Sequence, residues 1–380
     1  MRVLINQRYR ASFRKDFFVQ LTEKGVAEFF FVFGTADSRD YESVRQFGDE
    51  VNVKAMFCKY HGIFNGFVQW QSGIAACLRA IKPDVVVITP TPRVVSNFLW
   101  VLFCYFCDLR IIGWGMGEMP GRKGWRRKLH QVFQALLIRR LDAVICYSSN
   151  AVNYYSSMLP HRPVTWCPNT VDVEATAELA RQARFRKKKS IFITEEARDI
   201  SEHPYLQVLV LGRVTREKKL DDLLHAIPIT GPVEVNVVGE CQHIRLRREL
   251  DSLAIQRDIK IRWLGHQAGK FLADIVTATD VMVLPGRGGL AINHAMAHGV
   301  PVICSVADGT ETDLVIDGET GFLFEEGNLS DLTVALSSCC KDREMLRRLG
   351  RQAQAHVIAN FSAQLSVNAF IKGLKAGYDV

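Results

Sequence analysis

The sequence has little that would place a helix across a membrane. Its longest uncharged stretch, from Val94 to Cys107 between Arg93 and Asp108, is fourteen residues long. Because a helix needs about 20 residues to cross a bilayer, we expect residues 94–107 to form a buried helix instead. The opening MRVLINQRYR holds only a short apolar run before polar residues, which does not predict a signal peptide.

Cysteine pairs with metal-ligand spacing are scarce too. Only one C-x-x-C occurs, at Cys104 and Cys107, and most of the ten cysteines lie inside apolar runs. Without a second pair, this motif does not predict a zinc site. Free cysteines in apolar runs suit core positions in a reducing compartment, so we expect a cytoplasmic protein.

A length of 380 residues is comfortable for two domains. Hydrophobic residues make up 48% and charged residues 23%, a globular balance that allows each half its own core. Lys plus Arg is 48 and Asp plus Glu is 40, a formal charge of +8. This excess either aids solubility or attracts an anion such as a nucleotide diphosphate, acidic lipid or nucleic acid.

Short β-branched runs alternate with helical patterns along the whole chain. They are RVLIN, FFFVFG, PDVVVITPT, RIIGWG and LDAVICYS, then LQVLVLG, VEVNVVG, IKIRWLG, DVMVLPG and VPVICS. Apolar strands separated by helices predict the α/β class, with parallel sheets covered on both faces. The segment WCPNTVD interrupts the pattern, so we expect one domain over residues 1–168 and a second over residues 169–363.

Ligands of parallel α/β sheets bind at the carboxyl ends of the strands, which draws attention to the segment after LQVLVLG. There Gly212 allows a tight turn, and Arg213, Arg216, Lys218 and Lys219 follow. An arginine fork and a lysine point charge suit a diphosphate. A solvated basic loop has the same composition, so the two interpretations stay open on this segment.

A glycine-rich loop follows DVMVLPG and precedes the helical segment AINHAMAHG. Gly286, Gly288 and Gly289 let a ligand approach the backbone, and the helix N-terminus offers N–H groups to an anion. A plain turn is the other interpretation. His294 and His298 lie one helical turn apart, but no third ligand is evident, so we expect no metal there.

Residues 121–140, GRKGWRRKLHQVFQALLIRR, combine clustered cations with apolar residues at near-helical spacing. Such a helix lies on an anionic membrane, or it packs on the sheet with a basic outer face. The clustering of charge at its start favours peripheral contact with the membrane, at its inner face.

Six segments of the second half carry a resemblance. GRVTREKK is similar to G-R-x-x-x-E-K-G, VVGECQ to V-x-G-x-G, ATDVMVLPG to A-D-x-x-x-x-P-S, AMAHGVPVICS to A-M-A-x-G-x-P-V-I, DLVIDGETGFLF to E-x-V-x-D-G-x-x-G and PNTVD to P-N-G-V-D. Through these segments together the chain resembles the retaining GT-B glycosyltransferases of family 4, the glycosyl transferases group 1. The resemblance is densest from Gly212 to Leu332.

The resemblance implies two Rossmann-like, doubly wound parallel-sheet domains that face a central cleft, with a last helix, 364–380, packed on the first domain. It implies metal-independent transfer of a sugar, with retention, from a UDP- or GDP-linked donor on the second domain. The acceptor, a glycan, glycolipid or other hydroxyl compound, would bind the first domain, in polysaccharide or glycoconjugate biosynthesis. No cofactor and no nucleic-acid partner are implied.

The family motifs also assign roles. Arg213 and Lys218 would be catalytic, because they stabilise the departing diphosphate. The residues that would bind the donor are Gly212, Gly265, His266, Arg287, Gly288, Gly289, Leu290, His294, Glu311 and Asp313.

Some positions depart from the family. Gly286 and His294 stand where it has two glutamates; a neutral imidazole at 294 could still bind the donor ribose. Asp313 takes the place of a third glutamate, and Glu311 is a spare carboxylate nearby. In the first half, the expected glycine loop and histidine are replaced. The acceptor-side candidates are Arg8, Tyr9, Arg10, Met116 and Glu118.

The sequence therefore favours an active glycosyltransferase. The alternative is a catalytically inactive GT-B scaffold or nucleotide-sugar-binding protein, which Gly286 and His294 support. A GT-B phosphorylase is a weaker option, because no lysine suited to a pyridoxal Schiff base is identifiable.

Overall fold

The computed structural model describes residues 1–36, 52–63, 68–117, 125–193, 205–228, 232–307 and 309–379. The chain divides into two units, Met1–Asn169 with Ala363–Val380, and Thr170–Ser362. This division falls one residue after the boundary expected at WCPNTVD.

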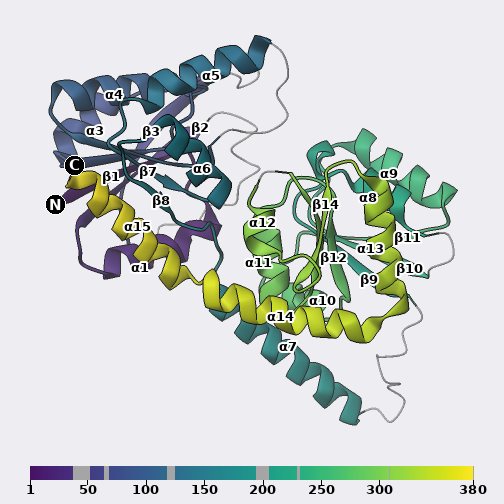
Figure 1. The fold of residues 1–380 in the computed structure, drawn as a ribbon. Helices are drawn as coiled ribbons and strands as arrows, with labels where there is room; N and C mark the ends of the chain where they lie inside the picture. The colour runs from purple at the N-terminus through teal and green to yellow at the C-terminus, as the bar shows by residue number, and fades with distance from the viewer. Residues whose placement is uncertain are drawn as a thin grey trace. The chain divides into compact units, whose positions relative to one another are not determined.

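The first unit is built on an eight-stranded sheet in the order β4-β3-β2-β1-β5-β6-β7-β8 (Figure 1). All neighbours pair in parallel except β3 and β4, which are antiparallel; the edge strand thus departs from the expected all-parallel sheet. The strands are β1 (Arg2–Gln7), β2 (Glu28–Ala36), β3 (Lys54–Ile63), β4 (Val68–Gln71), β5 (Val85–Ile88), β6 (Arg110–Gly115), β7 (Ala143–Cys146) and β8 (Val164–Trp166).

Helices cover both faces of this sheet, and the last helix of the chain is one of them. α15 packs against β7, β8 and α1, and the Oγ of Ser366 donates to the Pro168 carbonyl at 2.8 Å. The chain's C-terminal helix therefore belongs to the first unit. The helices are α1 (Lys15–Glu23), α3 (Ile74–Ile81), α4 (Ser96–Phe106), α5 (Trp125–Ile138), α6 (Ser149–Met158) and α15 (Ala363–Tyr378), with a 3-10 turn η1 (Ser12–Arg14).

The second unit holds a six-stranded parallel sheet in the order β11-β10-β9-β12-β13-β14. Its strands are β9 (Leu206–Leu211), β10 (Val233–Val238), β11 (Lys260–Gly265), β12 (Val281–Leu284), β13 (Val302–Val306) and β14 (Gly321–Glu325). Its helices are α7 (Val173–Ile193), α8 (Leu220–Ala226), α9 (Ile244–Gln256), α10 (Gly269–Thr277), α11 (Leu290–Ala297), α12 (Glu311–Leu314), α13 (Leu329–Lys341) and α14 (Arg343–Asn360), with a 3-10 turn η3 (Arg216–Lys218).

The central strands explain why the sequence reads as continuous apolar runs. Every residue of β5, β7 and β12 is buried. Helices cover both faces of each sheet, so polar residues do not alternate with apolar ones along these strands. Each sheet accordingly has two buried apolar clusters, one per face. Residues that could contact a ligand therefore lie in the loops that follow the strands.

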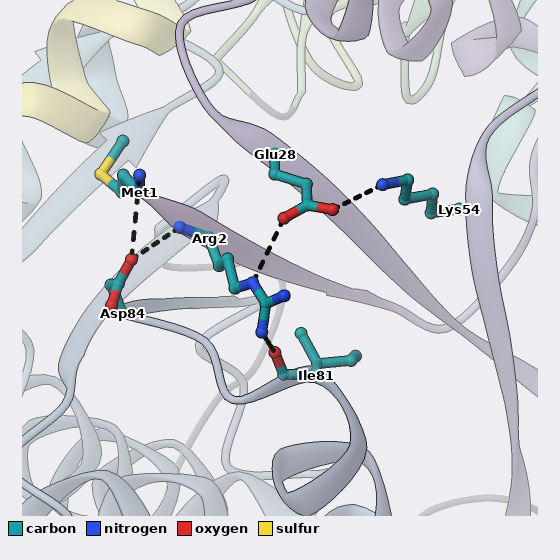
Figure 2. A network of polar contacts seen from close by, with 6 residues as sticks. All are labelled: Met1, Arg2, Glu28, Lys54, Ile81 and Asp84. Atoms are coloured by element: carbon teal, nitrogen blue, oxygen red, sulfur yellow. Dashed lines mark hydrogen bonds and ion pairs between the residues drawn. The ribbon is translucent and has the colours of Figure 1, made fainter.

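A polar network closes the amino ends of the first sheet (Figure 2). The backbone N–H of Arg2 donates to Asp84 at 2.7 Å, and its Nε donates to Glu28 at 3.2 Å. Lys54 bonds the other oxygen of Glu28, and this ion pair lowers the pKa of the Glu28 carboxyl. The network joins β1, β2, β3 and the start of β5, so we assign it a structural role.

Residues 94–107 do form a helix, α4, but the prediction that it is buried is wrong. Only part of α4 packs inward, through side chains such as Trp100 and Cys104. Its outward side chains Leu99, Leu102, Phe103, Tyr105 and Phe106 are exposed, as is Val95 just before the helix. An apolar run without charge cannot distinguish a buried helix from one that lies at the surface of its own unit.

The neighbouring helix α5 extends this exposed apolar surface. Its side chains Leu129, Val132, Phe133 and Leu136 are exposed, whereas Gln134, Leu137 and Ile138 face inward. The rings of Phe98 and Phe133 meet edge to face, with centroids 6.4 Å apart. Among the described residues, no helix is both long and apolar enough to cross a bilayer.

Candidate functional site

The loop after β9 brings a cation to the carboxyl edge of the second sheet. Gly212 has a φ of +111°, which favours glycine, and its N–H donates to the Val238 carbonyl at 2.9 Å. Arg213 follows and is exposed. It makes no hydrogen bond or ion pair with any residue that the structure describes. Its guanidinium is therefore available to an anionic ligand.

Lys218 links this loop to the glycine-rich loop after β12. Its Nζ donates to the backbone carbonyls of Arg287 at 2.7 Å and Gly288 at 3.0 Å. In return, the backbone N–H of Arg287 donates to the Glu217 carbonyl at 3.1 Å. The side chain of Arg287 also pairs with that of Glu217 at 3.4 Å, so the two loops that the sequence selected are adjacent and bonded to each other.

Gly286 explains one departure from the family motif. A Cβ on Gly286 would lie 2.0 Å from the backbone carbonyl oxygen of Glu217 and 2.9 Å from the carbonyl carbon of Lys218. Both atoms belong to backbone, which cannot rotate out of the way as a side chain does. A glutamate at this position would displace η3. The close contact between the two loops therefore requires glycine at position 286.

Glu311 holds the glycine loop from the other side. Its side chain is fully buried, and its carboxylate accepts hydrogen bonds from the N–H groups of Gly288 at 3.0 Å, Gly309 at 2.9 Å and Ala307 at 3.4 Å. Those bonds occupy both oxygens. Glu311 thus positions the backbone of the glycine loop, and its own contact with the donor stays a prediction.

The glycine loop leads directly into a helix N-terminus. Gly289, with a φ of +95°, precedes Leu290, the first residue of the eight-residue α11. The N–H groups of a helix's first turn have no partner within the helix and attract anions. Gly288, Gly289 and Leu290 therefore form the amino end of α11 beside Lys218, as the sequence anticipated.

His294 sits on α11 with its ring stacked on that of His298, the centroids 4.6 Å apart. Burial lowers the pKa of His294 to about 3, helped by the neighbouring His298, so its imidazole is neutral at physiological pH. The Nδ1 of His294 is buried and has no hydrogen-bond partner in the described chain. No cluster of three metal-ligating side chains occurs among the described residues.

The remaining donor candidates lie at neighbouring strand ends. Gly265 ends β11 with a φ of +64°, and His266 follows it; both are exposed. Asp313 lies on α12 and is partly exposed, unlike Glu311 on the same helix. The described residues of the second unit thus place every donor candidate at the carboxyl edge of its sheet or on the helices that follow.

The first unit contains a cavity of about 410 Å³ at the carboxyl edge of its own sheet. Its walls come from the segments after β1, β5, β6 and β7, together with α5 and α6. Arg8, Tyr9, Met116, Arg14, Arg93 and Tyr147 are among the lining residues. Three of the acceptor-side candidates thus share one cavity, as the rule for ligand sites in parallel sheets predicts.

Two other candidates do not join them. Arg10 is buried, does not line the cavity, and lies over the ring of Phe57 at 5.5 Å, so the cavity does not bring it together with the other acceptor-side candidates. Glu118 lies outside the described residues. Sequence reasoning missed Arg14 and Tyr147, because only the fold brings η1 next to the end of β7.

Residues 193–356 match the family described as Glycosyl transferases group 1. The sulfoquinovosyl transferase SQD2 of Arabidopsis thaliana is 27% identical over 152 residues, 39% of this chain and 29% of that protein. The lipopolysaccharide core biosynthesis mannosyltransferase LpsB of Rhizobium meliloti (strain 1021) is 26% identical over 255 residues, 64% of this chain and 68% of LpsB. The chain thus spans less than a third of SQD2.

A solved structure extends the likeness over the whole chain. HepE of Anabaena, crystallised in complex with UDP, superposes with a TM-score of 0.74 at 13% sequence identity, covering 99% of each chain. At this identity the likeness shows the fold, which the two proteins share in both units.

Proposed function

Since residues 193–356 belong to the group 1 glycosyltransferases and the chain has the GT-B fold, we propose that the protein transfers a sugar from a nucleoside diphosphate sugar to an acceptor hydroxyl. The carrying observation is the joined pair of loops in the second unit. There an exposed Arg213 and the Lys218–glycine loop contact lie at the strand ends, where anionic ligands of parallel sheets bind.

The proposed chemistry follows from the charges. As the bond between the sugar C1 and the phosphate oxygen breaks, negative charge grows on the leaving diphosphate. Arg213 supplies a fork of donors, and Lys218 a point charge, at the place where that charge develops. The acceptor oxygen forms the new bond to C1, and a phosphate oxygen takes the acceptor's proton. We propose attack from the same face, with retention and without a metal ion.

Lys218 has a second task in this proposal. In the structure its Nζ bonds two carbonyls of the glycine loop. Donor phosphates would compete for the same ammonium group, which has three hydrogens to share. Lys218 would then both hold the loop and contact the donor.

UDP is the favoured donor nucleotide. Solved structures of HepE, which has the same fold, contain UDP, UDP with glucose, and UDP-glucose. We place the nucleobase near Gly265 and His266, and the ribose near the neutral imidazole of His294. Buried polar nitrogen without a partner is costly, so a ribose hydroxyl that bonds the Nδ1 of His294 would remove an unfavourable feature of the unliganded protein.

We further propose that the first unit rests on an anionic membrane through α4 and α5. Both helices carry exposed apolar side chains and meet at the ring contact of Phe98 with Phe133. Lys128, Arg139 and Arg140 of the same region are exposed cations. Arg140 lies over the ring of Tyr105 at 5.3 Å, which places charge beside the apolar face. Apolar residues flanked by cations suit the boundary between headgroups and acyl chains.

Turnover of nucleotide sugars by purified variants tests the proposal. Arg213→Ala should lower turnover about a hundredfold, as loss of one preorganised donor to a developing charge does. The control is Arg216→Ala in the same loop: Arg216 is exposed and paired with Glu249 at 2.8 Å, so turnover should be unchanged. UDP at a hundred times its dissociation constant should stabilise the protein by about 2.7 kcal/mol.

Full turnover in Arg213→Ala would contradict the assignment of Arg213. Binding of UDP or UDP-glucose without any transfer or hydrolysis would instead support the inactive scaffold.

A further inference from the structure

The charged residues that line the cavity of the first unit indicate which class of molecule it binds. Arg8, Arg14 and Arg93 line it together with His130, and among its described lining residues there is neither aspartate nor glutamate. The other polar lining residues are neutral, mainly amides, hydroxyls and tyrosines. Its volume of about 410 Å³ lies in the range of small-molecule sites.

Arg14 is held in place by contacts on several sides. Its guanidinium lies over the ring of Trp114 at 4.3 Å, donates to the amide oxygen of Gln7 at 3.2 Å, and bonds the hydroxyl of Tyr147. A planar guanidinium fixed in this way loses little entropy when it binds a further oxygen atom.

The partners of Arg14 leave its charge in place. Gln7 is neutral, and burial raises the pKa of the Tyr147 phenol, so Tyr147 also stays uncharged at physiological pH. Arg14 makes no ion pair with a carboxylate among the described residues. A partly buried cation whose contacts are all neutral favours a ligand that brings the opposite charge.

The walls around these cations are held in place by the fold. The Nδ2 of Asn97 donates to the carbonyls of Thr89 and Thr91, each at 2.8 Å. The Nε2 of Gln134 donates to the Pro90 carbonyl at 2.8 Å. These bonds fix the segment after β5, which forms one wall of the cavity. The site is therefore preformed rather than assembled from loose side chains.

We propose that this cavity binds an acidic acceptor, through a phosphate or carboxylate group on Arg14, with Arg8 and Arg93 adding positive charge around it. That the anion is an acceptor rests on the proposed function, whereas the anion site is inferred from the cavity alone. Neutral amides and aromatic walls would contact the uncharged part of the same molecule. A neutral sugar would leave the Arg14 guanidinium with neutral partners only and should bind more weakly.

Titration calorimetry on the full chain tests the anion site, with inorganic phosphate, glucose 6-phosphate, glucuronate and glucose as probes. We expect saturable binding of the anionic probes, weakened by salt, and weaker binding of glucose. Stronger binding of glucose 6-phosphate than glucuronate would identify phosphate as the group, and the reverse order a carboxylate. Glucose binding as tight as both anionic sugars would overturn the proposal.

Variants locate the binding. Arg14→Gln should weaken binding of glucose 6-phosphate and glucuronate tenfold or more, as loss of a charged hydrogen bond does, and Arg14→Lys should retain part of it. Arg93→Gln changes an exposed side chain, tests the site without disturbing packing, and should also weaken binding. The matched control is Arg79→Gln on the exposed face of α3, which should bind like the wild type. Unchanged binding in both Arg14→Gln and Arg93→Gln would overturn the proposal.

Transfer assays separate the two proposals. With a working donor, acidic acceptors should show lower KM than their neutral counterparts, and Arg93→Gln should raise that KM more than it lowers kcat. Faster transfer to neutral acceptors overturns the acidic acceptor and leaves the proposed function standing. Arg14-dependent anion binding in a protein that turns over no nucleotide sugar supports the anion site and overturns the proposed function.

Discussion

The carboxylate of Glu311 accepts a hydrogen bond from the backbone N–H of Gly288 at 3.0 Å, and a Cβ on Gly288 would lie 2.7 Å from the same oxygen. The two residues are separated by β13 in the chain and come from different loops. Glycine is needed at 288 because the buried carboxylate occupies the space of a side chain. The contact fixes the backbone ahead of α11, where we place the donor phosphates.

Glu311→Gln should destabilise the protein and weaken donor binding together. An amide can accept at one position but presents its own N–H₂ to a second backbone donor, so at least one buried N–H loses its partner. We expect a loss of about 1–3 kcal/mol in the free energy of unfolding, measured by urea denaturation, and a raised KM for the donor. Glu319→Gln, at an exposed position, is the control. Unchanged stability in Glu311→Gln would refute the positioning role.

Gly286→Glu should not recover a more active enzyme, although it restores the residue found in the family. Its Cβ would meet the Glu217 carbonyl oxygen at 2.0 Å, and relief requires movement of η3, which carries Lys218. We expect Gly286→Ala to cost about 1–3 kcal/mol, as overpacking does, and both variants to lower turnover. The measurement is the urea midpoint combined with kcat. Higher turnover in Gly286→Glu would show that η3 moves at little cost.

The free energy of unfolding should fall as pH drops below 6.5, partly because of His294. Burial lowers its pKa from 6.5 to about 3. Between these values the unfolded chain binds a proton that the folded protein refuses, so acid favours unfolding by up to about 1.4 kcal/mol per pH unit. His294→Gln should make the free energy of unfolding depend less on pH between pH 6 and roughly pH 4. Chemical denaturation at a series of pH values measures this.

His243→Gln provides the comparison for that profile. His243 is exposed, so this variant makes the same substitution at a histidine that is not packed in the core. An identical slope in His294→Gln and the wild type would mean that the ring is more accessible to water than its stacked position on His298 indicates.

The α4–α5 surface should bind anionic vesicles. Leu99→Ser, Leu102→Ser and Phe106→Ser combined remove exposed apolar area, so binding should fall severalfold without loss of stability. Lys128→Glu with Arg139→Glu should abolish the salt-sensitive part. Ile255→Ser, a single exposed apolar residue on α9, is the control. Equal sedimentation of all variants with phosphatidylserine vesicles would exclude this surface as the contact.

The order of strands and helices could be predicted from the sequence, because buried parallel strands require unbroken β-branched runs. The loops after β9 and β12 were identified for the same reason: at the carboxyl ends of such strands, glycine and cations stand out against an apolar background. The strand ends drew attention to these two loops, whereas the choice of Arg213 and Lys218 among their cations came from the family resemblance and stays a prediction. The one strand that departs from the parallel sheet, β4, is short and only partly buried, so its direction left no mark in the pattern.

Only the tertiary structure shows which partners each candidate side chain has. The sequence placed Glu311 near the donor, but only the fold shows its carboxylate occupied by three backbone N–H groups. The sequence indicated Arg10 and left out Arg14. The contacts that hold Arg14 in the cavity come from Trp114 and Tyr147, which lie a hundred or more residues further along the chain. Likewise, an uncharged run predicted α4 but not its exposure. The local sequence pattern of a segment reflects whether that segment packs on its sheet as a strand or a helix. The partners of its side chains and the exposure of its outer face depend on which distant segments the fold brings beside it.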